Sequence, residues 1–296
     1  MKRFIYNFLL VTQIGIVVTG GAVRLTGSGL GCPTWPECTP GSYTPVPHQA
    51  QGVLHSWIEF GNRLLTFLLF IAILASIIGY LRWGRQRSDS RRLGFLALTQ
   101  FLGIVAQIVV GGISVLTHLN PFAVGAHFIL SIVLIAATVS FRERMLDTQR
   151  VRVSHYVALL SRILLLLSFV VITLGIFVTG SGPHAGDEMA KRFNLDPRTI
   201  SWLHADSVIA LVSLTIGTYI LMKAIENGQA REVALPALGT FLIVIFAQGA
   251  IGYTQYFTGL PEILVGAHLL GACLVWASIW RYAYTTMLLE RVRQTK

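Results

Sequence analysis

The tetrapeptide Val124-Gly125-Ala126-His127 recurs 141 residues later in the chain as Val265-Gly266-Ala267-His268. Several matches at this offset, and others at nearby offsets, indicate an internal duplication. The further pairs are Gln107 with Gln248, Gly111 with Gly252, Leu119 with Leu260, Val18-Thr19-Gly20 with Val178-Thr179-Gly180, and Leu54-His55 with Leu203-His204. The sequence therefore predicts two related halves.

The composition places both halves in a membrane. Of the 296 residues, 54% are hydrophobic and only 12% are charged, whereas a soluble domain carries about 25% charged residues. A helix needs about 20 mainly apolar residues to cross the hydrocarbon core. An ordinary soluble enzyme and a disordered chain are excluded, and the first span is expected to be retained rather than cleaved as a signal peptide. The eight candidate spans are residues 4–23, 53–81, 93–116, 123–141, 157–179, 201–223, 235–257 and 262–284.

The formal net charge of +10 comes from basic residues that are unevenly placed. In an eight-span chain, most of them fall on the side that also holds both termini. By the positive-inside rule this side is cytoplasmic, which explains the charge without a nucleic-acid partner. These residues are Lys2, Arg3, Arg82, Arg85, Arg87, Arg91, Arg92, Arg142, Arg144, Arg150, Arg152, Lys223, Arg231, Arg281, Arg291, Arg293 and Lys296.

We therefore expect an all-α integral membrane protein of the cell membrane, with eight transmembrane helices in two tandem four-helix bundles. Both halves start on the cytoplasmic side, so the bundles should be related by pseudo-two-fold symmetry about the membrane normal. The expected division is an N-terminal bundle at 1–141, a cytoplasmic linker at 142–156 and a C-terminal bundle at 157–296.

Four of the 8 histidines lie in the outward parts of spans, and the repeat relates His55 to His204 and His127 to His268. Each half then offers two histidines, on its second and fourth helices. Two imidazoles facing each other inside a four-helix bundle can hold a heme iron through its axial positions. The alternative is that each histidine forms an interhelical hydrogen bond. Zinc is disfavoured because the local Cys/His spacing is unsuitable. The other histidines, which are His48, His118, His155 and His184, are expected to be solvated or to cap helices.

A carboxylate and two arginines lie near the outer mouth of the first half. Glu59 follows His55 by four residues and so shares its helix face. One interpretation is a structural pair with Arg63; the other is a catalytic carboxylate beside a heme edge, which accepts protons or stabilises a cation. Arg24 and Arg63 are candidate partners of heme propionates, because guanidinium binds carboxylates through two hydrogen bonds.

Cys32 and Cys38 lie in the first outer loop, on the oxidising side, where a disulfide is expected. A structural disulfide and a redox-active pair both remain open at this stage. The C-x-x-C-H pattern of covalent heme attachment is absent. Cys273 is expected to be an ordinary core residue.

Two sequence stretches closely resemble heme A synthases. The first is GGAVRLTGSGLGCPTWPEC, residues 20–38, which is similar to the first outer loop of that family. The second is Ile58-Glu59-Phe60-Gly61-Asn62-Arg63 in span two. The duplicated eight-span pattern extends the resemblance over essentially the whole chain.

The resemblance implies an oxidoreductase that converts a methyl group of heme O to a formyl group, giving heme A for terminal oxidases. It implies a heme b cofactor in one half, with heme O as the substrate in the other. The family glutamate falls on Glu59, the loop cysteines on Cys32 and Cys38, and two family histidines on His127 and His268.

The chain also departs from the family pattern. The span-two histidine of many members is replaced by Asn62, so we expect His55 and His204 to provide the ligands of spans two and six. The second outer loop lacks the cysteine pair of some members, which excludes a role that needs both pairs.

The carboxylate Glu59, the arginines of the outer mouth and the loop cysteine pair all lie in the first half, so we assign the substrate to that half. Heme b is then assigned to the second half, between His204 and His268. A di-heme b-type electron-transfer cytochrome is the main alternative, and a transporter is a weaker one. Expected partners are membrane lipid and a heme O synthase that hands over the substrate, together with an unidentified electron acceptor and a second copy of the chain.

Overall fold

The computed structural model describes residues 1–187 and 190–288, and these form eight α-helices joined by loops and turns. The helices are α1 (Lys2–Leu25), α2 (Val53–Trp83), α3 (Ser90–Leu116), α4 (Pro121–Met145), α5 (His155–Ser181), α6 (Pro197–Ile225), α7 (Gly228–Phe257) and α8 (Glu262–Thr285). Each is long and apolar enough to cross a membrane, which confirms the eight predicted spans. The protein is therefore a multi-pass membrane protein.

The helices are longer than the apolar windows because polar helix-forming residues extend them. The clearest case is α7, which begins at Gly228, seven residues before the predicted span. Its first turns carry Gln229, Arg231 and Glu232, which are good helix formers but not membrane residues. The helix continues through Pro236. Hydropathy therefore located the span but not the end of the helix.

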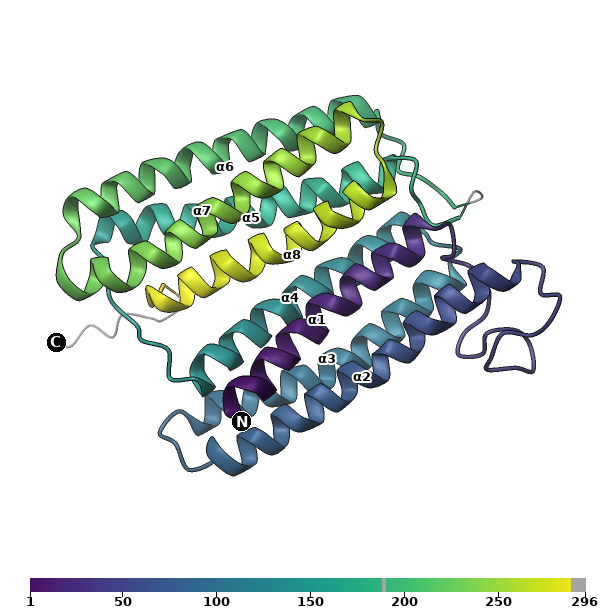
Figure 1. Ribbon diagram of the computed structural model, residues 1–296, viewed down its shortest axis with the longest axis horizontal. Helices are drawn as coiled ribbons and strands as arrows, with labels where there is room; N and C mark the ends of the chain where they lie inside the picture. Colours follow the sequence, from purple (N-terminus) through teal and green to yellow (C-terminus); the bar gives the residue numbers. More distant parts are fainter. Residues whose placement is uncertain (188–189, 289–296) are drawn as a thin grey trace.

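Helices α1–α4 lie together in one part of the molecule and α5–α8 in the other (Figure 1). Within the first group α1 packs on α2, α2 on α3, α3 on α4 and α4 on α1. The second group repeats this order from α5 to α8. Consequently α2 is diagonal to α4, and α6 is diagonal to α8. The pseudo-two-fold axis itself remains a prediction.

The two halves meet through α1, α4, α5 and α8. The indole N–H of Trp276 on α8 donates to the carbonyl of Ile132 on α4 at 2.7 Å. The indole of Trp280 donates to Oγ of Ser140 at the same distance. The largest buried apolar cluster includes residues of both halves, among them Ile132, Leu164 and Trp276. The interface is thus a continuous core.

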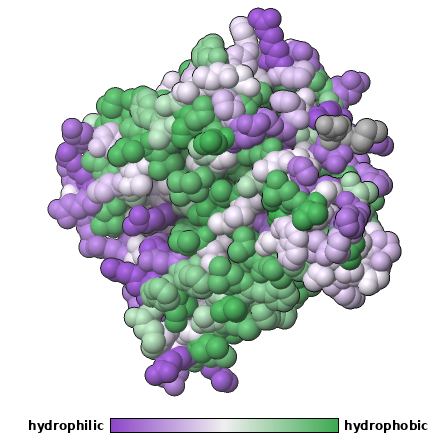
Figure 2. Space-filling model, turned by 45° about the vertical axis from the view of Figure 1, so that its right-hand side comes forward, coloured by the Kyte–Doolittle hydropathy of each residue, from purple (hydrophilic) through white to green (hydrophobic). Residues whose placement is uncertain are grey.

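Outside this core, large apolar side chains face outward. Phe67, Leu166 and Ile243 are each more than three fifths exposed. Hydrophobic residues cover much of the middle of the face shown in Figure 2, and hydrophilic residues gather toward its edges. An apolar surface of this kind suits contact with lipid.

The turn between α3 and α4 matches the turn between α7 and α8. Leu119 and Leu260 both have positive φ angles, 57° and 63°. The amide of Leu119 donates to the carbonyl of Ser114, and that of Leu260 donates to Gln255, which is again an offset of 141 residues. The duplication is therefore present in backbone geometry as well as in sequence.

Candidate functional site

The C-terminal half holds a pair of facing histidines. His204 on α6 and His268 on α8 have ring centroids 6.4 Å apart and ring planes at 74°. The Nδ1 atom of His204 is 3.0 Å from the carbonyl of Val171, which fixes the ring and leaves Nε2 available. A metal-binding histidine usually has its other ring nitrogen held by a carbonyl or carboxylate in this way.

The pair fits the axial positions of a heme iron. Two imidazoles on one iron place their ring centres about 6 Å apart, because each metal–nitrogen bond is about 2 Å long. Nδ1 of His268 is buried and has no hydrogen-bond partner. Among the described residues no group of three or more His, Cys, Asp or Glu could hold a metal ion, so a macrocycle that supplies the equatorial ligands suits two histidines best.

Glycines allow neighbouring helices to approach these rings. A Cβ placed on Gly252 of α7 would lie 3.0 Å from Cε1 of His268. One on Gly175 of α5 would lie 3.5 Å from Cε1 of His204. A larger side chain at position 252 would therefore push the His268 ring from its place.

The N-terminal half repeats the arrangement around His127 on α4. A Cβ on Gly111 of α3 would lie 3.3 Å from Cε1 of His127. Gly252 of α7 has the same position relative to His268, at 3.0 Å. The Nδ1 atom of His127 is also buried without a partner. His127 is therefore placed as His268 is, in agreement with the 141-residue repeat.

His55 lies elsewhere. It is the third residue of α2, and its Nδ1 is 2.9 Å from Oγ of Ser28 in the first outer loop. The described ring contacts include no pair of His55 with His127 to match the pair in the other half. The role of His55 as an iron ligand stays a prediction. Asn62, seven residues further along α2, has a buried Oδ1 with no hydrogen-bond partner.

Glu59 and Arg63 together hold the first outer loop against α2. One Glu59 oxygen accepts from Arg63 at 2.6 Å, and the other accepts from the backbone N–H of Cys32, also at 2.6 Å. Arg63 also donates to the carbonyls of Cys32 and Thr34 at 3.0 and 3.1 Å. The structure thus contains the ion pair of the first interpretation, while the catalytic role of Glu59 stays a prediction.

Cys32 and Cys38 form the expected disulfide, and both cysteines are fully buried. Gln49 donates from Nε2 to the carbonyl of Gly31, which attaches a later part of the same loop. The loop is therefore closed at one end by the disulfide and attached to α2 by Glu59 and Arg63.

Arg24 joins the outer loops of the two halves. Its guanidinium donates to the carbonyl of His184 at 2.6 Å and to that of Thr179 at 2.9 Å. The amide of Gly29 donates to the carbonyl of Gly186 at 2.9 Å. Contact of Arg24 and Arg63 with heme propionates stays a prediction, since both side chains bind backbone carbonyls here.

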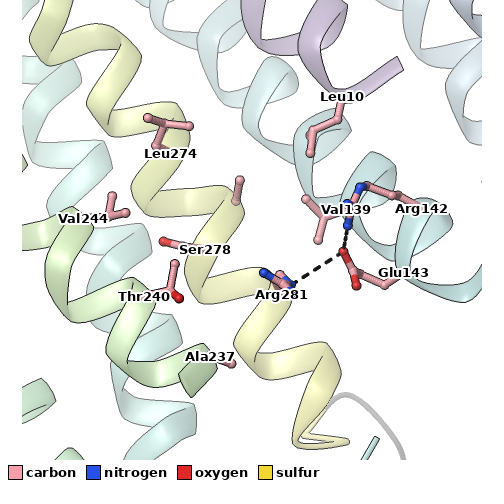
Figure 3. A pocket seen from close by; sticks show the side chains of 11 residues that line it. Leu10, Val139, Arg142, Glu143, Ala237, Thr240, Val244, Leu274, Ser278 and Arg281 are labelled. Atoms are coloured by element: carbon pink, nitrogen blue, oxygen red, sulfur yellow. Dashed lines mark hydrogen bonds and ion pairs between the residues drawn. The ribbon is translucent and has the colours of Figure 1, made fainter. Parts of the chain in front are cut away.

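A different cluster, which the sequence did not single out, lies toward the ends of α4 and α8. A cavity of about 250 Å³ between the halves is lined there by Arg142, Glu143 and Arg281 and by apolar residues of four helices (Figure 3). Glu143 is 1% exposed and pairs with Arg142, with Arg281 at 3.8 Å, and with the hydroxyl of Thr148 at 2.5 Å. The sequence signal for this cluster is the single acid Glu143 between Arg142 and Arg144 in a predicted cytoplasmic segment.

The sequence of the chain matches a known protein family. Residues 3–192, more than half of the chain, match the sequence model of the cytochrome oxidase assembly protein family, COX15-CtaA. This chain belongs to that family. The match covers all of the first half and the start of the second.

Several curated relatives of this chain are named "Heme A synthase". The protein of Geobacillus kaustophilus is 32% identical over 127 residues, which is 43% of this chain and 37% of the relative. That of Geobacillus thermodenitrificans is 29% identical over the same length. That of Exiguobacterium sibiricum is 28% identical over 180 residues, 59% of this chain and 58% of the relative. The matched segments thus span between about a third and three fifths of these relatives.

Proposed function

We propose that the protein is a heme A synthase, which oxidises a methyl group of heme O to a formyl group. The observation that carries the proposal is the facing pair His204 and His268, 6.4 Å apart, in a member of the cytochrome oxidase assembly family. The relatives are named for the synthesis of heme A, which supports the proposal. The same names support an oxidoreductase that acts on heme O, and its dependence on a bound heme is part of our proposal.

In this proposal His204 and His268, whose rings face each other, would hold the heme b iron. When bound, heme b supplies one-electron redox chemistry. The carbonyl of Val171 orients His204, and Gly252 lets α7 close against His268. The apolar side chains of the bundle exclude water from the ring edges.

The N-terminal half then takes heme O, with His127 as a ligand to its iron. Oxidation of the methyl group to the formyl group, with water as the oxygen source, removes electrons and protons; the electrons pass to an external electron acceptor, and the protons pass to water and to a basic side chain. Glu59 is the group we assign to proton acceptance, and it can also stabilise positive charge that develops on the substrate. To accept a proton it must give up part of its contact with Arg63 or with the Cys32 N–H.

We further propose a plasma-membrane location with both termini in the cytoplasm. The basic connections at residues 82–92, 142–152 and 223–231 all lie at the end of the bundle that holds the N-terminus (Figure 1). Arg291, Arg293 and Lys296 lie outside the described residues. A heme O synthase is the expected donor of the insoluble substrate.

The pigment of the purified protein tests the proposal. A heme A synthase purified from cells that make heme O should release heme b together with heme O or heme A on extraction. A di-heme cytochrome would release heme b alone, and a transporter would release none. Detection of heme b alone under these conditions would overturn the proposed reaction.

A further inference from the structure

One pattern recurs in all four helix pairs of the bundle. A glycine on the first helix of each pair lies next to an inward polar residue on the second. In three pairs that residue is a histidine, and in the pair α1–α2 it is Asn62, whose Nδ2 would be 3.8 Å from a Cβ on Gly20. The pairs are Gly20 with Asn62, Gly111 with His127, Gly175 with His204, and Gly252 with His268.

The position of Asn62 along its helix also matches His204 better than that of His55 does. Asn62 and His204 are 142 residues apart, within one residue of the offset that relates α3 and α4 to α7 and α8. His55 is two residues from the start of α2, whereas His204 is seven residues from the start of α6. Since a helix rises about 1.5 Å per residue, His55 and Asn62 are about 10 Å apart along the axis.

The chemistry of Asn62 differs from that of a histidine. Its side chain is neutral, and an amide oxygen is a ligand that suits Mg²⁺ or Ca²⁺, while imidazole suits iron. Its Oδ1 is buried and accepts no hydrogen bond. A small molecule in front of Asn62 could donate to that oxygen.

We infer that the N-terminal half binds its heme through one protein ligand, His127, instead of the pair with His55 that the sequence suggested, and leaves the iron face toward Asn62 open to a small exchangeable ligand. The inference rests on the proposed function and deepens it. His204 and His268 hold the resident heme on both faces, whereas the substrate heme is held on one. A heme that must leave after reaction is thereby bound less tightly than the cofactor.

The test uses the full-length protein, purified from cells that make heme O, with carbon monoxide as the probe of the reduced iron. A heme with two histidine ligands is low-spin and binds carbon monoxide poorly, while one with a single histidine binds it. We expect one high-spin, carbon-monoxide-binding heme and one low-spin heme per chain. Asn62→His should convert the first to low spin and lower its carbon monoxide binding at least tenfold.

Two further variants act as matched controls. His204→Asn copies the first-half arrangement into the second half, so a second carbon-monoxide-binding heme should appear. His55→Gln should leave the spin state and the carbon monoxide binding of the first half unchanged. The low-spin signal of the second half reports in each first-half variant that the protein is folded.

The inference would be overturned by a wild-type protein with two low-spin hemes, by a new carbon-monoxide-binding heme in His55→Gln, or by no effect of Asn62→His. A protein that binds heme only in the second half would also contradict it. The failure of the proposed function is separate, because it is read from the identity of the extracted hemes. If the first half holds heme b instead of heme O, the spin state and carbon monoxide binding of that heme still show how many histidines bind its iron.

Discussion

Glu59 combines an observed structural task with a proposed catalytic one. Its carboxylate is 6% exposed, accepts from Arg63 and also accepts from the Cys32 amide, so it attaches the disulfide loop to α2. A buried carboxylate is kept charged only when it is paired and hydrogen-bonded, and these two partners provide both. The same charge is what we propose the reaction uses. The structural and catalytic tasks can be separated, because only one needs a proton acceptor.

The variant Glu59→Gln separates them. The glutamine oxygen can still accept from the Cys32 amide, but the side chain no longer takes a proton. We expect heme A formation to fall on the order of 100-fold, with the heme b of the second half retained. Glu37→Gln is the control, since Glu37 lies in the same loop and accepts from the Gly41 amide. Undiminished heme A formation by Glu59→Gln, measured by chromatography of extracted hemes, would remove Glu59 from the mechanism.

The disulfide between Cys32 and Cys38 should contribute to the stability of the folded protein. By the chain-entropy relation, a loop this short contributes about 2 kcal/mol to the free energy of unfolding. Replacing both cysteines with serine should cost about that amount, measured by thermal unfolding. If the bond is structural, the variant that remains folded at low temperature still makes heme A. Complete loss of product in folded protein would instead assign the pair a redox role.

At the scale of elements, helix ends position the site. Asp196 caps α6, two turns before His204, by accepting from the N–H of Thr199 at 2.8 Å and from its hydroxyl at 2.5 Å. These hydrogen bonds, led by that of the Thr199 side chain, hold the pKa of Asp196 below its usual value of 3.8. Because the pKa is lowered in the folded state, the charged cap stabilises the helix at pH values above 3.8. This stabilisation is lost as the pH falls from 3.8 through the lower pKa of the folded state.

Hydrogen exchange of the Thr199 amide measures this cap. Its protection factor should be constant above about pH 4 and fall at lower pH, as Asp196 is protonated. Asp196→Asn keeps a capping oxygen without a charge and should show no such fall. Asp196→Ala should be poorly protected at every pH. A pH-dependent loss of the same size in Asp196→Asn would contradict this role of the carboxylate.

Apolar run length predicted the spans, the oxidising side of the membrane predicted the disulfide, and the repeat predicted that His127 and His268 occupy matching places. They did not predict the contacts of Arg24 with Thr179 and His184, because residues about 155 apart in sequence meet only when the two halves pack. Hydropathy also missed the polar first turns of α7, which form helix outside the apolar window. Short sequence matches aligned His55 with His204, while helix packing places Asn62 nearer the equivalent position.

At the scale of the whole molecule, apolar packing and buried indole hydrogen bonds join the halves more than the ion pair between them does. Arg281 is about half exposed and lies 3.8 Å from Glu143, so that cross-half ion pair contributes well under 1 kcal/mol. Trp276 is 5% exposed and donates to Ile132 across the interface. A buried hydrogen bond between membrane helices is worth about 1 kcal/mol. The indole therefore matters more than the ion pair.

Thermal unfolding of the detergent-solubilised protein tests that ranking. Cys273 is free and fully buried on α8, so a thiol-reactive dye reports its exposure. Trp276→Phe should lower the unfolding temperature, and Arg281→Ala should change it little. Trp202→Phe is the matched control, because Trp202 is exposed and donates to Tyr256 at the surface. An equal effect of Trp202→Phe and Trp276→Phe would contradict a special role for the interface.

The central claim is the conversion of heme O to heme A. Its most direct test is expression of this chain together with a heme O synthase in cells that lack heme A, followed by chromatography and mass spectrometry of the extracted hemes. We predict heme A in cells with the wild-type chain, and heme O without heme A in cells with His268→Ala. Accumulation of heme O alone in the presence of folded, heme b-loaded wild-type protein would contradict the account.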